Sequence, residues 1–266
     1  MTVARQVAQR RDWYHTLELA PGVETPGWFD LRGIAEEMPI PSSLAGKRCL
    51  DVGAFDGFWS FEMERRGAAE VVALDILDPR EWDWPVGSDA KVIRAISERK
   101  GTGEGFEIAR QALHSNGERI ELSVYDLDPD DVGRFDFIYV GSLLLHLRDP
   151  IKALERVGAV ASAQVVICDA IDLWRSLFSP RTPVAVLEGR GRPWWWKPNL
   201  AGLVRMVEAG GLRVTGRPHR IFMPPGRGHP RRWVRPRMLL TPPGRAKLFS
   251  SWFGDPHAVL TGWPKV

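Results

Sequence analysis

A short glycine turn and an acidic residue beyond it are the positions best suited to chemistry in this sequence. Residues 53–57 read Gly-Ala-Phe-Asp-Gly and follow an apolar run, and Asp75 ends the next apolar run, 22 residues after Gly53. A buried strand, a glycine turn at a helix N-terminus and a carboxylate at the end of the next strand are typical of half of a nucleotide-binding fold. The glycines let a ligand approach the backbone, and the carboxylate accepts hydrogen bonds from ribose hydroxyls.

The turn differs from that of a dinucleotide site, and the differences change the expected ligand. A dinucleotide fold needs Gly-x-Gly-x-x-Gly, but Phe55 stands at the middle glycine and the third glycine is missing. Asp56 adds a negative charge where a phosphate would lie at the helix N-terminus, which is unfavourable. An acidic turn instead favours a cationic adenosine ligand without phosphates, such as S-adenosylmethionine (SAM). An ordinary tight strand–helix turn is the alternative interpretation.

A second acidic loop follows the third predicted strand. In a SAM site Asp126 would accept a hydrogen bond from the exocyclic amine of adenine, while Leu127 would pack on the ring. Three further acids crowd the same loop, namely Asp128, Asp130 and Asp131.

Taken together, these motifs resemble the class I SAM-dependent methyltransferases. The resemblance covers residues 45–222 and rests on four motifs, at 50–57, 73–75, 126–127 and 135–138. It implies SAM as cofactor, S-adenosyl-L-homocysteine (SAH) as product, and a role for Asp51 near the methionine amino group, Asp75 at the ribose and Asp126 at the adenine. The implied cofactor-binding residues are Asp51, Gly53, Ala54, Phe55, Asp56, Gly57, Asp75, Ile76, Asp126, Leu127, Gly141 and Ser142.

Within that superfamily, residues 135–150 and 198–206 are similar to the tRNA wobble-uridine (carboxy)methyltransferase group. Two features depart from that group. Leu145 stands where the tRNA enzymes carry a tyrosine before the histidine, and only about 46 residues precede the first predicted core strand. In size the chain is more similar to the tailoring methyltransferases of actinobacterial secondary metabolism. We therefore expect O- or N-methylation of a small molecule, with tRNA modification and a non-catalytic SAM-binding protein as alternatives.

His146 is the predicted catalytic residue. It follows the fourth predicted strand, at the carboxyl edge where α/β sheets bind ligands. Its ordinary pKa suits a general base at neutral pH, which contributes about 10²–10⁴-fold to a rate. The alternative is a loop histidine that only shapes the site, because holding the nucleophile in line with the methyl group supplies much of the effect.

Aromatic residues supply the predicted acceptor pocket. The chain has 12 Trp but only 3 Tyr, and three of the Trp are adjacent at 194–196. Small-molecule pockets are mostly apolar and aromatic, although core packing explains many such residues. The predicted substrate-binding residues are Tyr14, His15, Trp28, Trp195 and Trp196. No Cys/His spacing for zinc and no convincing carboxylate cluster for magnesium is found, so we expect no metal.

The elements that position these residues alternate between strands and helices. Strands are predicted at 47–53, 70–75, 119–125, 135–140, 164–169, 212–222 and 233–241, and helices at 57–67, 105–115, from 150 and at 200–209. This order predicts an α/β, Rossmann-like methyltransferase fold, a mostly parallel seven-stranded sheet with a C-terminal antiparallel hairpin. The predicted parts are an N-terminal lid or extension (1–46), a SAM-binding core (47–245) with a lid insertion (170–197), and a tail (246–266).

Composition limits the partners. Residues 209–254 hold ten Lys or Arg and no acid although the whole chain is only +3, so this basic part is either a solvated surface or a contact for phosphates or RNA.

Cys49 and Cys168 are expected on the first and fifth core strands, too far apart for a disulfide. No signal core or membrane-spanning run is apparent, and we expect a cytoplasmic protein. The Trp-rich segments indicate either a homodimer or a mobile lid.

Overall fold

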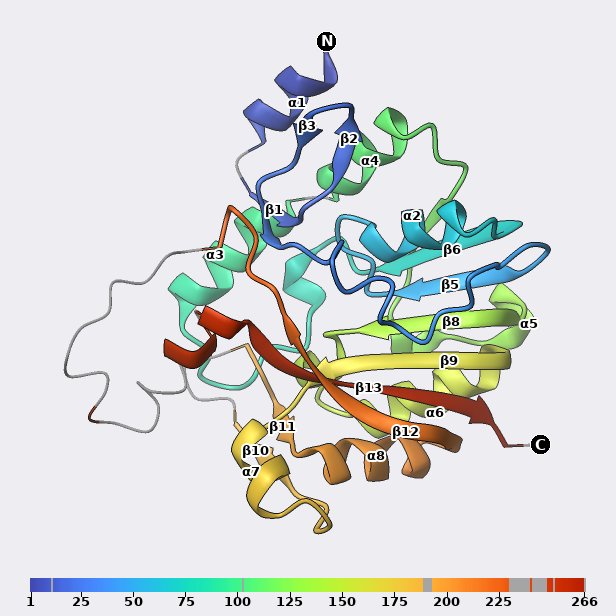
Figure 1. Ribbon diagram of the computed structural model, residues 1–266, viewed down its shortest axis with the longest axis vertical. Helices are drawn as coiled ribbons and strands as arrows, with labels where there is room; N and C mark the ends of the chain where they lie inside the picture. The colour runs from blue at the N-terminus through green and yellow to red at the C-terminus, as the bar shows by residue number, and fades with distance from the viewer. Residues whose placement is uncertain are drawn as a thin grey trace.

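The computed structural model describes residues 1–10, 12–101, 103–188, 193–229, 240, 248–250 and 252–265, apart from the side chain of Arg99. Figure 1 shows a central sheet with helices on both faces and the N-terminal segment packed across one of them. The basic run 231–237 and, apart from Leu240, the predicted strand 233–241 lie outside the described residues.

A seven-stranded sheet has the strand order β12-β13-β9-β8-β5-β6-β7. Its strands are β5 (Arg48–Val52), β6 (Glu70–Asp75), β7 (Glu118–Glu121), β8 (Phe135–Gly141), β9 (Ala161–Ala170), β12 (Leu212–Met223) and β13 (Asp255–Pro264). The pairs from β7 to β9 are parallel, whereas β13 is antiparallel to both β9 and β12. The mostly parallel Rossmann-like sheet with an antiparallel C-terminal pair is therefore confirmed.

Helices cover both faces because each central strand is apolar on both sides. The described α-helices are α1 (Val3–Gln9), α2 (Phe58–Arg65), α3 (Ala90–Lys100), α4 (Glu104–Ala112), α5 (Pro129–Val132), α6 (Pro150–Val160), α7 (Leu173–Phe178) and α8 (Leu200–Ala209). One core cluster joins α2 and α4 to one face of the sheet, and a second joins α6 and α8 to the other. Pro150 begins α6 as expected, with Asp149 accepting a hydrogen bond from the Lys152 N–H at 3.0 Å.

The N-terminal segment belongs to the first of these cores. It contains α1 and the short strands β1 (Trp13–His15), β2 (Glu18–Ala20), β3 (Val23–Glu24) and β4 (Gly27–Phe29). Trp13, Leu31 and Leu44 are buried in the cluster that includes α2. The segment thus packs as part of the fold, and Figure 1 shows β1 near the ends of α3 and α2.

Interlocked backbones hold this segment in place. A Cβ on Gly27 would lie 2.1 Å from the His15 carbonyl carbon, and a Cβ on Gly226 would lie 2.3 Å from the Gly27 oxygen. The Gly226 N–H donates to the Trp28 carbonyl at 2.7 Å. Only glycine permits so close an approach, so residues 13–29 and the turn after β12 are fixed against each other.

Two sequence expectations need correction, and one helix was missed. The strand that pairs with β12 is β13, at 255–264, so the predicted tail 246–266 contributes a strand between β9 and β12. The third core strand ends at Glu121 rather than at 125, because the Ser123 hydroxyl accepts the Tyr125 N–H at 3.3 Å and begins a 3-10 turn, η2 (Val124–Asp126). The helix α3 was not foreseen.

The lid insertion (170–197) contains little regular secondary structure. It contains α7 and an antiparallel pair, β10 (Ala185–Leu187) with β11 (Trp196–Pro198). The strands β5 and β9 point toward the side of the molecule where α3, α7 and this pair lie, on the left of Figure 1. The amino end of the antiparallel β13 lies at that same edge. Cys49 and Cys168 are buried and free on β5 and β9, with β8 between them, as expected.

Candidate active site

The glycine turn after β5 is bent back onto β6. The N–H groups of Gly53 and Ala54 donate to the Leu74 carbonyl at 2.8 and 3.2 Å. Phe55 adopts a positive φ of 52°, and Gly57 one of 87° directly before α2. A Cβ on Gly57 would lie 2.7 Å from the rings of both Phe61 and Phe106, so glycine is required there for space as well as for conformation.

Asp75 lies at the end of β6 beside this turn, as predicted. One carboxylate oxygen accepts the Phe55 N–H at 2.8 Å, and the other accepts the N–H of Ile76 at 2.9 Å. The first oxygen also receives the ammonium of Lys100, the last residue of α3. Lys100 is only 1% exposed, and its Nζ lies 4.4 Å from the centroid of the Phe55 ring. Sequence reasoning missed Lys100 because α3 itself was not recognised.

Asp51 is buried on β5 under the first turns of α2. Its Oδ2 accepts the Ser60 hydroxyl at 2.7 Å. Burial raises the pKa of Asp51 to about 7. The position beside the turn agrees with the implied one near a cationic ligand group, and the role stays a prediction.

Asp56 serves the fold and does not face a ligand position. Its Oδ2 accepts the backbone N–H groups of Tyr14 at 2.5 Å and His15 at 3.2 Å. Its Oδ1 leaves no room for a Cβ on Gly105. The carboxylate is 2% exposed, and burial raises its pKa. Asp56 therefore ties β1 to the turn, which corrects the expectation that its charge points toward a bound ligand.

The predicted adenine contacts are divided between surface and core. Asp126 is exposed at the end of η2, where a ligand can reach it. Leu127 is fully buried among Leu50, Leu74 and Val124, so it has no free surface on which a ring could pack. Tyr125 instead links two loops, donating its hydroxyl to Asp83 at 2.6 Å and accepting the Asp149 N–H at 3.0 Å.

The loop after β8 is fixed by a residue that sequence reasoning missed. Asp169, buried at the end of β9, accepts the N–H groups of Leu143, Leu144 and Leu145 at 2.8, 2.7 and 3.3 Å. Burial raises the pKa of Asp169 to about 6. An acid at a parallel strand end, one strand away from His146, was the available signal.

Ser142 begins this loop in a strained conformation. Its φ is 50°, and its Oγ lies 3.0 Å from Nε2 of His257 on β13. Nδ1 of His257 lies 3.0 Å from the Asp255 carbonyl oxygen. Since a carbonyl only accepts, Nδ1 carries the proton and Nε2 accepts the Ser142 hydroxyl. A Cβ on Gly141 would lie 2.5 Å from Cε1 of the Tyr139 ring. Sequence reasoning missed His257 because it lies within residues 246–266, which were predicted to be a tail.

His146 lies in η3 (Leu144–His146) of the same loop. Its Nδ1 is 2.7 Å from the Pro193 carbonyl oxygen, so Nδ1 is the protonated nitrogen and the Nε2 lone pair remains available. Burial lowers the pKa of His146, which keeps the ring neutral and able to accept a proton. This geometry supports the predicted base without assigning it a substrate.

Tyr14 and His15 are brought to the glycine turn. The Tyr14 ring lies 4.7 Å from that of Phe55, centroid to centroid, and the His15 ring lies 5.9 Å from that of Phe58. His15 is buried, and both burial and the Lys100 charge lower its pKa to about 3. Tyr14 is therefore the member of this pair with exposed surface beside the turn.

The predicted tryptophans lie on other segments. Trp28 packs against His229, with ring centroids 5.8 Å apart. The indole N–H of Trp195 donates to the Asp83 carbonyl at 2.5 Å, and that of Trp196 to the Arg148 carbonyl at 3.0 Å. The Trp195 indole thus anchors the lid insertion to the loop after β6, and the Trp196 indole anchors it to the loop that carries His146. Contact of either indole with an acceptor stays a prediction.

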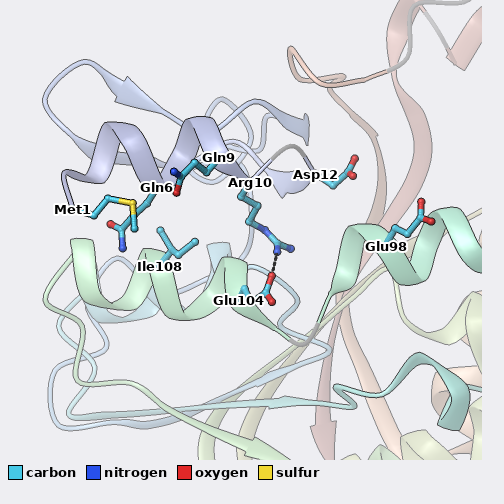
Figure 2. Close-up of a pocket in the computed structure, with 8 residues that line it drawn as sticks. All are labelled: Met1, Gln6, Gln9, Arg10, Asp12, Glu98, Glu104 and Ile108. Carbon is cyan, nitrogen blue, oxygen red and sulfur yellow. Dashed lines mark hydrogen bonds and ion pairs between the residues drawn. The ribbon is translucent and has the colours of Figure 1, made fainter.

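A separate polar hollow of about 420 Å³ lies between α1 and α4. Figure 2 shows Arg10 reaching across it to Glu104, an ion pair of 2.9 Å. None of the predicted site residues lines this hollow.

Among the residues that the structure describes, no group of three or more His, Cys, Asp or Glu is placed to hold a metal ion. In the same residues no helix combines the length and the apolar character needed to span a membrane.

Comparison with known proteins identifies the architecture. No family model matches the chain, and no curated protein matches it by sequence. Among solved structures, the N-terminal domain of EvdMO1 in the presence of SAH and D-fucose has a TM-score of 0.57 and 17% identity, over 99% of this chain and 96% of that one. The SAH-bound magnesium protoporphyrin IX methyltransferase ChlM of Synechocystis PCC 6803 has a TM-score of 0.52 and 12% identity, over 88% of this chain and 82% of that one. The chain has the Rossmann-like fold of class I SAM-dependent methyltransferases.

Proposed function

We propose that the protein is a SAM-dependent methyltransferase that transfers a methyl group to an oxygen or nitrogen of a small-molecule acceptor. The observation that carries this proposal is that two loops meet at one edge of the sheet. One lies beside a carboxylate, and the other carries an imidazole. The turn at 53–57 is hydrogen-bonded to Asp75 at the end of β6, and the loop after β8 places the neutral His146 at the same edge. The Leu143 side chain of the second loop lies close to the first, because a Cβ added to Gly53 would be only 3.4 Å from Leu143 Cδ1.

The residues of the turn fit SAM better than a phosphate-bearing nucleotide. Phe55 donates its N–H to Asp75, so it is not free for a phosphate oxygen. The ammonium of Lys100 is paired with the same carboxylate. Asp75 would hold the ribose, Asp126 the adenine amine, and Asp51 would lie near the ammonium of the methionine part. The buried Leu127 would support this surface from below.

SAM supplies a methyl group on a sulfonium, which needs no further activation. The protein's contribution is to hold the acceptor atom in line with that methyl group, an effect that can reach about 7–11 kcal/mol. His146 Nε2 would take the proton of an acceptor O–H or N–H as the acceptor bonds to the methyl carbon and the carbon–sulfur bond breaks. The Pro193 carbonyl holds the imidazole with its lone pair available for that step.

The small-molecule acceptor is supported by size and by the structural neighbours. The EvdMO1 domain was solved with D-fucose, and ChlM is named for a porphyrin substrate. The short strands of residues 13–29 and the lid insertion at 193–198 both reach the active edge, where they would enclose a ligand of modest size. A secondary-metabolite acceptor in the cytoplasm remains our expectation.

Two measurements test the proposal. Calorimetric titration with SAH should show binding by the folded protein. Incubation with SAM and mixtures of phenols, sugars and heterocyclic amines should release SAH together with one product heavier by a methylene. A folded protein that binds neither SAM nor SAH would contradict the proposal. Binding without turnover on any acceptor would instead favour a non-catalytic SAM-binding protein.

The tRNA alternative rests on the resemblance of residues 135–150 and 198–206 and on a basic segment. That segment, 231–237, lies outside the described residues. The alternative predicts strongly salt-dependent tRNA binding, and absence of binding at low salt would exclude it.

A further inference from the structure

The lone pairs of Asp75 are nearly all in use. A carboxylate offers about four hydrogen-bond positions, two on each oxygen. Oδ1 accepts one backbone N–H, from Ile76, whereas Oδ2 accepts the Phe55 N–H and the Lys100 ammonium. Three of the four positions are therefore occupied by the protein itself, and one, on Oδ1, is left.

Two neighbouring ribose hydroxyls need two positions. The two backbone N–H groups belong to the turn and to the end of β6, and cannot leave without unfolding them. The Lys100 side chain is different, because its ammonium is carried on a flexible four-carbon stem and can rotate away without moving the backbone. Lys100 is therefore the partner that a diol would have to replace.

Lys100 has other favourable contacts at hand when it leaves. Its Nζ already lies over the Phe55 ring, 4.4 Å from the centroid. Its charge also acts on the carboxyls of Asp51 and Asp56, where it lowers the pKa against the larger effect of burial. Displacement from Asp75 thus leaves the ammonium within the same acidic surroundings.

We propose that Lys100 is an affinity-setting residue of the cofactor site, which holds one of the two positions on Asp75 required by the ribose diol and gives it up when the cofactor binds. This inference rests on the proposed function. It means that the measured affinity for SAM and SAH is lower than Asp75 alone would allow, because each binding event must first break the ion pair between Lys100 and Asp75. Free enzyme and bound enzyme then differ in where the Lys100 ammonium lies.

Calorimetric titration with SAH tests the exchange. Lys100→Met keeps the apolar stem and removes the competitor, so SAH should bind at least about tenfold more tightly, equivalent to one broken ion pair of modest strength. Lys100→Arg keeps the charge and should not show this gain. Lys91→Met, at the exposed first turn of the same helix, is the matched control and should bind SAH as the wild type does.

A second ligand separates competition from a general effect on the site. The 3′-deoxy analogue of SAH presents one hydroxyl and can use the position already free on Oδ1, so its gain from Lys100→Met should be clearly smaller than that of SAH. Unchanged or weaker SAH binding by a folded Lys100→Met or Lys100→Gln variant would overturn the inference, and so would equal gains for both ligands. Failure of the wild type and of all folded variants to bind SAH would instead contradict the proposed function.

Discussion

The glycine turn after β5 and the loop after β8 lie at the same edge of the sheet, but they are held in different ways. The backbone of the turn is held by the next strand, since its N–H groups go to Leu74 and Asp75, and its Asp56 side chain is bonded to the more distant β1. The loop is fixed by distant chain, through Asp169, Pro193 and His257. The first site is thus a local unit that a sequence pattern can reveal, whereas the second exists only after the whole sheet has formed.

Removing the imidazole of His146, in the loop after β8, should have the largest effect. His146→Ala should lower the rate of methyl transfer by about 10²–10⁴-fold, because the Nε2 lone pair that would take the acceptor's proton is lost. SAH affinity should change little. Steady-state kinetics with an acceptor found in the screen measures the rate, and calorimetry measures the affinity. A rate within a few-fold of the wild type would show that His146 only closes the loop onto Pro193.

Asp169→Ala should destabilise the whole loop. Three loop N–H groups lose their common acceptor inside the protein, and each unsatisfied buried group costs about 1–3 kcal/mol. We expect the free energy of unfolding to fall by about 3 kcal/mol or more, measured by urea denaturation. Asp172→Ala, which removes a helix cap from α7, is the control and should cost only about 1 kcal/mol. Equal losses for the two variants would contradict the role given to Asp169.

A substitution beside the glycine turn should act mainly by weakening the binding of the ligand. Asp75→Ala should weaken SAH binding roughly 10- to 150-fold, because hydrogen bonds to a charged group contribute about 1.5–3 kcal/mol. The substitution also leaves Lys100 buried without its ion-pair partner, which is destabilising. The comparison is therefore best made in a Lys100→Met background. Affinity that survives there would show that Asp75 does not hold the ribose.

Acid should weaken the contact between the turn and β1. Burial and the Lys100 charge lower the pKa of His15 to about 3 in the fold, against 6.5 for an exposed histidine. The unfolded chain therefore binds the proton first, so His15 reduces stability by about 1.4 kcal/mol for each pH unit as the pH falls from 6.5 toward 3.

The His15→Phe variant isolates this effect. The difference in unfolding free energy between wild type and variant, measured by denaturation at several pH values, should shift in favour of the variant as the pH falls. Asp51 and Asp169, whose raised pKa values act in the opposite direction, are common to both proteins and cancel in the difference. His219→Phe, at the exposed surface of β12, should keep the wild-type dependence. A difference that does not change with pH would contradict the buried, neutral His15.

The smallest effect is expected at the start of the loop. Ser142→Ala and His257→Phe each remove one partner of a neutral hydrogen bond of 3.0 Å, worth about 0.5–1.5 kcal/mol. In a double-mutant cycle on the free energy of unfolding, the two substitutions should show a coupling of that size. Strict additivity would mean that the two side chains do not interact in solution.

The contrast between the two regions also explains how far the sequence could be interpreted. The strand at 70–75 and the helix at 200–209 match the structure residue for residue, because an apolar run ending at an acid and one ending at paired glycines mark their own limits. The turn and Asp75 were predictable for the same reason. Asp169 also ends an apolar run, but its role as acceptor for the loop after β8 depends on how the strands pair, which the run does not show. His257 carries no such local mark. Lys100 reaches Asp75 from the last turn of α3, whose cap Asp89 and following Gly101 were the available signal.

The placement of β13 has a consequence for the newly made chain. Residues 255–264 are the last part of the sheet to be synthesised, yet they lie between β9 and β12. Until they leave the ribosome, both of those strands present an unpaired edge, which is a template for pairing with other chains. The sheet should therefore close only after residues 255–264 have been synthesised, and until then the chain should depend on protection from aggregation.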